Sequence, residues 1–311
     1  MKKENFLVTG AAGFIGAAVA AYLLRQGHSV VTIDNLSTGN KKNLPEGIEF
    51  LQGDCQSGAI IEKLENRQFE AIFHIAGQSS GEISYDNPVY DLQTNAQSTL
   101  QLLQLANKIG CKKFIYASTM SVYGNQPDVA VKESFSTVPL SFYGVGKLAS
   151  EHYLRIYHNQ YGINSVALRL FNVYGPGQNM ENLRQGMVSI FLAQAMADNA
   201  IHVKGSKDRF RDFVYIDDVV SAFISAWQKM PGGTLIANVG SGKKTTVETL
   251  VSGIMRQMHE EVRVKYEGST PGDQFGIFAD MSVMKDKFGW TPQIDLNEGL
   301  QRMVSWARQK T

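Results

Sequence analysis

Short apolar runs rich in β-branched and aromatic residues alternate along the chain with longer segments in which apolar residues recur at helical spacing. This alternation is typical of βαβ units, in which helices join consecutive parallel strands and cover the sheet. The runs predict seven strands, at Asn5–Thr9, Ser29–Ile33, Ile48–Leu51, Ala71–Ile75, Lys113–Ser118, Ser165–Leu170 and Leu235–Val239. The segments between them predict helices at Gly13–Gln26, Ser57–Glu65, Asp91–Ile109, Phe142–Tyr161 and Ile216–Lys229. The expected fold class is therefore α/β, a doubly wound parallel sheet.

The regular alternation ends after Leu170. A loop at Asn172–Asn182 follows, and then come shorter elements and a final helix near Leu296–Gln309. We therefore expect a first domain over residues 1–172 and a smaller second domain over 173–311. The helix and strand predicted between 214 and 239 resemble those of the first sheet, so this stretch is expected to return to the first domain.

The composition of the chain argues against several classes of protein. Of the 311 residues, 43% are hydrophobic and 19% are charged, with a formal net charge of +1. These values are ordinary for a globular protein, so neither disorder nor attraction to nucleic acid or an anionic membrane is expected. Cys55 and Cys111 are the two cysteines, and neither they nor the six histidines have disulfide or metal-ligand spacing.

The N-terminal stretch needs a separate judgement, because the basic residues 2–3 precede the apolar-looking run Phe6–Leu24. A signal peptide has this outline. Glycines within the run have a better explanation, given below, and no other stretch approaches the roughly 20 apolar residues that span a bilayer. A cytoplasmic location is expected.

Glycines follow the first predicted strand and open the first predicted helix, at Gly10, Gly13 and Gly16. In this position they permit a tight turn, let the backbone approach a pyrophosphate, and leave room for the helix to pack on the sheet. The N-terminus of the helix then offers free N–H groups to phosphates. The alternative is a turn that uses glycine for geometry alone. The pattern favours a Rossmann-type dinucleotide site.

An acidic residue, Asp34, ends the second predicted strand, 18 residues after Gly16. There a carboxylate can accept hydrogen bonds from both ribose hydroxyls and would repel a 2′-phosphate, so NAD is favoured over NADP. Asp54 follows the third predicted strand and could meet the adenine amino group, or could instead cap a helix. The adjoining residues predicted to border the cofactor are Phe14, Ile15, Asn35 and Cys55.

Polar residues at the carboxyl end of the fifth predicted strand suggest the chemistry, because ligands of open parallel sheets lie at that edge. Ser118 and Thr119 stand there, and the following helix carries Tyr143 and Lys147 one turn apart. A nearby ammonium favours the phenolate, which would lower the pKa of the tyrosine from about 10 and make it a usable base. A solvated helix face is the alternative reading of this pair.

Several motifs together resemble the extended short-chain dehydrogenase/reductases, and within them the nucleotide-sugar epimerase subgroup. They are T-G-A-A-G-F-I-G at 9–16, V-Y-G at 122–124, Y-G-V-G-K at 143–147, L-R-L-F-N-V-Y-G-P-G at 168–177, R-D-F-V-Y-I-D-D-V at 211–219 and G-W-T-P at 289–292. The resemblance runs over essentially the whole chain. It implies an NAD-binding domain at 1–172 and a mainly substrate-binding domain at 173–311.

The resemblance also implies roles for individual residues. Tyr143 would be the base, Lys147 its electrostatic partner and a ribose ligand, and Thr119 the hydroxyl that hydrogen-bonds the reacting sugar oxygen. The implied substrate ligands are Ser118, Thr119, Asn172, Arg211 and Asp273, of which Asn172 and Arg211 would bind the diphosphate. One departure is Thr270, where the family often has arginine; Arg184 or Arg209 could supply the missing charge.

Within the subgroup, dehydratases and decarboxylases place an acidic residue one or two positions after the catalytic hydroxyl. Here those positions hold Met120 and Ser121. The predicted activity is therefore an NAD-dependent 4-epimerase of UDP-hexoses or UDP-N-acetylhexosamines, acting through a transient 4-keto sugar. A 4-ketoreductase with the same residues, and a non-catalytic NAD-binding sensor, stay open as alternatives.

The resemblance also predicts a homodimer. Apolar residues at helical spacing occur on two long predicted helices, at Leu100, Leu103, Ala106, Leu148, Tyr153 and Tyr157. Core packing would explain part of this stripe. The rest matches the intersubunit helix bundle of the family.

Overall fold

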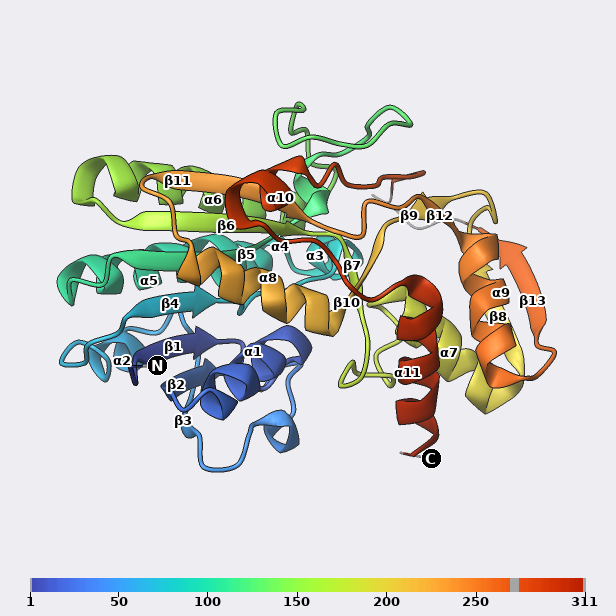
Figure 1. The fold of residues 1–311 in the computed structure, drawn as a ribbon, viewed down its shortest axis with the longest axis horizontal. Helices are drawn as coiled ribbons and strands as arrows, with labels where there is room; N and C mark the ends of the chain where they lie inside the picture. Colours follow the sequence, from blue (N-terminus) through green and yellow to red (C-terminus); the bar gives the residue numbers. More distant parts are fainter. Residues whose placement is uncertain (1, 269–273, 310–311) are drawn as a thin grey trace.

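The computed structural model describes residues 2–268 and 274–309, and its centre is a seven-stranded parallel sheet (Figure 1). The strand order is β11-β6-β5-β4-β1-β2-β3. The bounds are β1 Asn5–Thr9, β2 Ser29–Asp34, β3 Glu49–Gln52, β4 Ala71–His74, β5 Lys113–Thr119, β6 Asn164–Leu170 and β11 Thr234–Val239. The order reverses direction between β1 and β4, and open sheets of this kind bind ligands at such a point. All seven predicted strands lie in this sheet, so the predicted fold class is confirmed.

Helices cover both faces of the sheet (Figure 1). One face packs against α1 (Phe14–Arg25) and α8 (Ile216–Gln228), and the other against α2 (Gly58–Glu62), α5 (Ser98–Lys108) and α6 (Phe142–Tyr161). Central strands are consequently buried on both sides, which explains why their sequences are continuous apolar runs without alternation. β11 pairs in parallel with β6 over residues 234–239, so the chain crosses back to the sheet after leaving it.

The helix predicted over Asp91–Ile109 is present, but it contains a π-helical turn. The chain forms α4 (Pro88–Leu92), a single π-helical turn at Gln93–Gln97, and then α5. The hydroxyls of Ser98 and Thr99, at the start of α5, donate to backbone carbonyls of this turn four residues earlier, at 2.6 and 2.7 Å. Hydroxyls that bond the backbone in this way bend helices, and π-turns are frequent beside functional sites.

The second half of the chain forms a smaller lobe beside the carboxyl edge of the sheet (Figure 1). Its paired strands are β7 (Asn172–Tyr174) with β10 (Phe213–Tyr215), β8 (Ala200–Lys204) with β13 (Arg263–Glu267), and β9 (Phe210–Arg211) with β12 (Thr245–Thr246). The helices of the smaller lobe are α7 (Met187–Asp198), α9 (Val247–Met258) and α11 (Leu296–Arg308), whereas α10 (Ser282–Phe288) packs beside β11 and α8 of the sheet. A short helix α3 (Gly81–Asp86) follows β4. Among the described residues, no helix combines the length and apolar character needed to cross a bilayer.

Candidate active site

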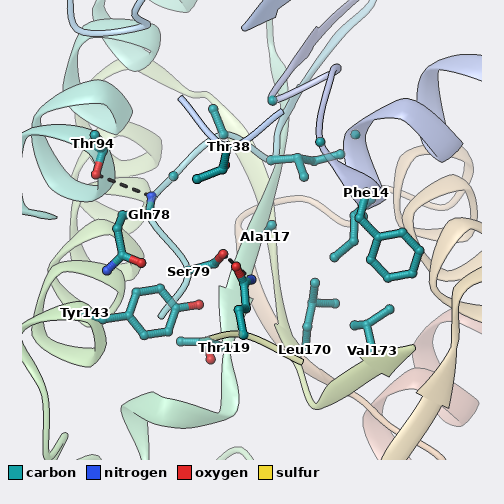
Figure 2. Close-up of a pocket in the computed structure, with 18 of the residues that line it drawn as sticks. Phe14, Thr38, Gln78, Ser79, Thr94, Ala117, Thr119, Tyr143, Leu170 and Val173 are labelled. Atoms are coloured by element: carbon teal, nitrogen blue, oxygen red, sulfur yellow. Dashed lines mark hydrogen bonds between the residues drawn. The ribbon is translucent and has the colours of Figure 1, made fainter. Parts of the chain in front are cut away.

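A cavity of about 540 Å³ opens where the strand order reverses, between the sheet and the smaller lobe. The first half of the chain contributes residues that follow β1 and β4, the end of β5 and the start of α6, and the second half contributes the loop after β7 and the start of α7. Figure 2 shows Tyr143 and Thr119 on one wall and Phe14, Leu170 and Val173 across from them. The cavity is thus built from both halves of the chain.

The glycine turn requires glycine because backbone segments approach one another closely there. Gly10 has a φ of 69°, and a Cβ atom placed on it would lie 2.7 Å from the backbone nitrogen of Ala76. A Cβ on Gly16 would overlap the carbonyl oxygen of Gly10. Helix α1 begins directly after Gly13, which provides no side-chain cap, so its first N–H groups are available to an anion. This geometry fits the pyrophosphate of NAD.

Asp34 lies at the end of β2 and lines the cavity with 8% of its surface exposed. Its Oδ2 accepts a hydrogen bond from the backbone N–H of Ala12 at 2.9 Å, and its Oδ1 accepts one from Leu36 at 2.8 Å. These bonds hold the carboxylate in place. Two carboxylate oxygens offer about four acceptor sites, so two ribose hydroxyls can still be bound.

Other residues predicted to border the cofactor also lie on this wall, namely Phe14, Ile15, Asn35, Asp54 and Cys55. The Nδ2 of Asn35 donates to Oδ1 of Asp54 at 2.6 Å, which orients that carboxylate. Helix α2 has Ser57 at its N-cap, so capping by Asp54 is not the explanation for the acid there. Burial raises the pKa of Cys55 to about 12, which keeps this thiol neutral.

Tyr143, Lys147 and Thr119 form the opposite wall. Tyr143 and Lys147 are 8% and 3% exposed, which excludes a solvated helix face. The Nζ of Lys147 donates to the backbone carbonyl of Ala117 at 2.9 Å and lies 6.0 Å from the centroid of the Tyr143 ring. Thr119 Oγ1 accepts from the backbone N–H of Ser121 at 3.1 Å, so the end of β5 fixes its position.

The expected lowering of the pKa of Tyr143 is not found in the protein alone. Burial raises the pKa of Tyr143 to about 12, although a hydrogen bond with Thr119 lowers it. Burial also lowers the pKa of Lys147 to about 8. Attraction between phenolate and ammonium would lower the pKa of Tyr143, as the sequence predicts. Desolvation of both groups is the larger effect here.

The predicted substrate ligands fall into three groups. Ser118, Thr119 and Asn172 line the cavity. Arg211 is 2% exposed and donates to the backbone carbonyls of Phe275 and Gln274, at 3.1 and 2.6 Å, without forming part of the cavity wall. Asp273 lies outside the described residues, as does Thr270.

His74 behaves as the buried core residue expected from its strand. Its Nδ1 lies 2.8 Å from Thr9 Oγ1 and its Nε2 lies 3.1 Å from Thr99 Oγ1. Burial holds the pKa of His74 well below its usual value, and Lys147 lowers it further. The imidazole is therefore neutral and serves to tie β1, β4 and α5 together.

Sequence reasoning missed a polar rim where the two halves meet. The Nε2 of Gln185 donates to Ser79 Oγ at 2.5 Å (Figure 2 shows Ser79 at the cavity). Arg184, named above as a possible phosphate ligand, pairs with Asp86 at 2.7 Å beside this rim. Ser79 follows β4 at the same edge of the sheet as Ser118, so the rule that identified Ser118 could have identified it. Gln185 lies 106 residues further along, and the sequence offers no signal for that pairing.

Comparisons with known proteins agree with this geometry. The sequence profile of the NAD-dependent epimerase/dehydratase family matches residues 6–240. The UDP-glucose 4-epimerase of Mycolicibacterium smegmatis is 34% identical over 98% of this chain and 99% of its own length. A crystal structure of UDP-glucose 4-epimerase from Thermotoga maritima with UDP-glucose has a TM-score of 0.94 and 35% identity, covering 98% and 99% of the two chains. UDP-N-acetylglucosamine 4-epimerase from Methanobrevibacter ruminantium also has a TM-score of 0.94, with 30% identity and full coverage of both chains.

Proposed function

The chain belongs to the NAD-dependent epimerase/dehydratase family, and from this membership we propose that Thr119, Tyr143 and Lys147 carry out its chemistry. The protein is an NAD-dependent nucleotide-sugar 4-epimerase that acts through a transient 4-keto sugar. The observation that carries the assignment of residues is their meeting on one wall of the cavity, across from the glycine turn and Asp34.

In the proposed mechanism, Tyr143 takes the proton from the C4 hydroxyl of the sugar and Thr119 hydrogen-bonds the same oxygen. Bound NAD, held by the glycine turn and Asp34, would supply the hydride acceptor for C4 and would end the turnover unchanged. Lys147 stabilises the phenolate of Tyr143, which is the form that accepts the proton, since with a pKa of about 8 the lysine is mostly an ammonium at neutral pH. Return of hydride and proton to the other face of the planar C4 inverts that centre.

The residues after Thr119 favour epimerisation over elimination. Met120 and Ser121 line the cavity at the positions where related dehydratases and decarboxylases carry an acid. A thioether and a primary hydroxyl cannot donate a proton to a departing C6 hydroxyl at neutral pH. The 4-keto sugar then has one open route, which is reduction.

We further propose that the substrate is a UDP-linked hexose or N-acetylhexosamine, because relatives named for both types share the fold over nearly the whole chain. In this proposal Asn172 and Ser118 contact the substrate, and the predicted cofactor ligands from Gly10 to Cys55 hold NAD. We also propose a division into an NAD-binding part at 1–172 with 214–239 and a substrate-binding part over the rest, because both parts contribute residues to the cavity.

The test is a panel of UDP-sugars incubated with the purified holoenzyme, without added NADH. We expect one or more to be converted to the C4 epimer with unchanged mass, and the same final ratio to be reached from either epimer. Mass spectrometry and chromatography measure both. A product lighter by one water would contradict epimerisation, and a product formed only in proportion to added NADH would identify a ketoreductase instead.

A homodimer is also part of the proposal, although the predicted apolar stripe is only partly at the surface. Leu103 and Ala106 are fully buried in the core between α5 and the sheet. Other apolar side chains on α4 and α6 are exposed, with 63% for Val89, 57% for Leu92 and 51% for Ile156. Exposed apolar residues gathered on neighbouring helices are typical of a subunit interface.

Light scattering should therefore give about twice the chain mass of 34.4 kDa for the wild type. Ile156→Glu should shift the mass toward that of one chain, because the interface would then bury an unpaired carboxylate. Val138→Glu is the matched control, since Val138 is an equally apolar residue, 63% exposed, in a loop outside these helices. A wild type with the mass of a single chain would contradict the proposed dimer.

A further inference from the structure

A buried carboxylate that the mechanism above does not use lies behind the catalytic wall. Asp91 of α4 is 1% exposed, and its Oδ1 accepts hydrogen bonds from Gln78 Nε2 at 2.8 Å and Asn95 Nδ2 at 3.1 Å. Its Oδ2 is also buried and has no hydrogen-bond partner among the described residues, and the same holds for Oδ1 of Asn95. A buried carboxylate oxygen left without a donor is costly, so this arrangement needs an explanation.

Two glycines place this pair beside the ammonium of Lys147. A Cβ atom on Gly77 would lie 3.2 Å from Lys147 Nζ and would overlap Asn95 Oδ1. A Cβ on Gly146 would lie 3.5 Å from Asp91 Oδ2 and 3.3 Å from Asn95 Cβ. Gly77 and Lys147 are part of the cavity wall, so Asp91 and Asn95 form the layer directly behind it.

The other groups around Lys147 do not provide a negative charge. The Tyr116 ring of β5 and the Tyr143 ring of α6 lie with their centroids 4.8 and 6.0 Å from Nζ, and His74 of β4 is kept neutral by burial. Glu151 follows Lys147 by one turn of α6, but its carboxylate is paired with Arg169 at 2.7 Å.

Asp91 therefore opposes the effect of burial on the lysine. Burial lowers the pKa of Lys147, and the charge of Asp91 raises it. In the other direction, burial raises the pKa of Asp91, and the charge of Lys147 lowers it. Each group thus favours the charged form of the other.

We propose that Asp91 is a positioning residue that keeps Lys147 an ammonium although this side chain is buried, and that it acts on the reaction through this charge. The proposal rests on the proposed roles of Lys147 and Tyr143. The carboxylate of Asp91 supplies the counter-charge, and glycine at positions 77 and 146 keeps side-chain atoms out of the space beside Lys147 Nζ and Asp91 Oδ2.

The direct test is the titration of Lys147 in the intact protein with Asp91→Asn, which keeps the shape and the Oδ1 acceptor but removes the charge. Lysine labelled with ¹³C at Cε gives an NMR resonance for Lys147, which disappears in Lys147→Met and is thereby assigned. We expect a pKa near 8 in the wild type and a value lower by roughly one unit in Asp91→Asn. Glu62→Gln removes an equal charge from the exposed surface of α2 and should leave the titration unchanged.

The same shift should appear in the pH dependence of kcat/KM. Because the ammonium is the form that assists Tyr143, activity should fall as the pH rises through the pKa of Lys147, and this alkaline limb should move to lower pH by the same amount in Asp91→Asn. The variant would then lose more activity at pH 8.5 than at pH 6. A purely structural role for Asp91 would lower activity equally at both.

If Asp91→Asn does not fold, the reciprocal measurement decides. In Lys147→Met, the carboxyl of Asp91, observed by ¹³C NMR, should titrate at a higher pH than in the wild type. An unchanged Lys147 titration in folded Asp91→Asn, or an unchanged Asp91 titration in Lys147→Met, would overturn the proposal. Neither NMR titration depends on turnover. If Tyr143 and Lys147 had no role in catalysis, this would appear separately, because their variants would keep full activity.

Discussion

Replacing Tyr143 with phenylalanine should lower turnover by about 10²- to 10⁴-fold, the contribution typical of a positioned acid–base group. The substitution removes one hydroxyl and keeps the ring, so the packing of α6 against the cavity is preserved. Bound NAD should be retained, because the glycine turn and Asp34 lie on a different wall. Initial rates with a converted UDP-sugar measure the first effect, and absorbance of the cofactor released on denaturation measures the second.

Tyr153→Phe is the matched control, since Tyr153 lies on the same helix, half-buried and outside the cavity. Its turnover should stay within about a factor of two of the wild type, as is usual for a change of this size away from a site. A Tyr143→Phe enzyme that keeps a tenth of the activity would mean that another group takes the proton.

The sheet was predictable from the sequence because its strands are buried on both faces. A parallel strand such as β4, Ala71–His74, is apolar up to its last residue, and helices must alternate with such strands to connect them. The π-turn at Gln93–Gln97 was not predictable in this way. Its apolar spacing continues on both sides, and the π-turn depends on hydroxyl-to-backbone bonds that spacing does not report.

The hydrophobic pattern of the smaller lobe predicts its helices and strands less well. Helix α7 (MVSIFLAQAMAD) is apolar on most of its surface, so it shows little helical period. Helix α9 does carry a signal that could have been used: Thr246 caps it by accepting from the N–H of Thr249 at 3.1 Å. The strands here are two to five residues long, and short strands carry little pattern.

For the site, local geometry was predictable and long-range geometry was not. Gly10, Asp34 and Thr119 follow from their positions at strand ends, which a parallel sheet brings to one edge. The direction of the Arg211 guanidinium, toward the carbonyls of Gln274 and Phe275, depends on a loop 63 and 64 residues away. The pKa values of Tyr143 and Lys147 depend on burial, and a sequence gives no measure of burial for a single polar group.

A second buried charge pair connects the catalytic helix to the sheet. Glu151 and Arg169 are 3% and 2% exposed, and Arg169 donates to both carboxylate oxygens, from Nε at 2.9 Å and from Nη2 at 2.7 Å. Ser118 Oγ also donates to Glu151 at 2.6 Å. The guanidinium carbon lies 4.6 Å from the centroid of the Tyr123 ring. Glu151 is one turn beyond Lys147, so the pair fixes α6 relative to β5 and β6.

Arg169→Met should therefore lower the free energy of unfolding by about 3–5 kcal/mol, the usual cost of leaving one partner of a buried ion pair alone. The side chain removed is replaced by one of similar length, so the loss comes mainly from the unpaired carboxylate of Glu151. Urea unfolding followed by fluorescence measures the change. Out of a typical total of about 5–15 kcal/mol, such a loss would put part of the protein in the unfolded state.

The double variant Glu151→Leu/Arg169→Met separates charge from packing. With both charges removed, no ion stays buried without a partner, and exchanging a buried pair for apolar side chains is often close to neutral. The double variant should consequently be more stable than Arg169→Met alone, even though it carries one more substitution. If the double variant is as unstable as the single variant, the stability at this position comes from the shape of the arginine and its contact with Tyr123. The ion pair would then hold Ser118 and α6 in place without stabilising the fold.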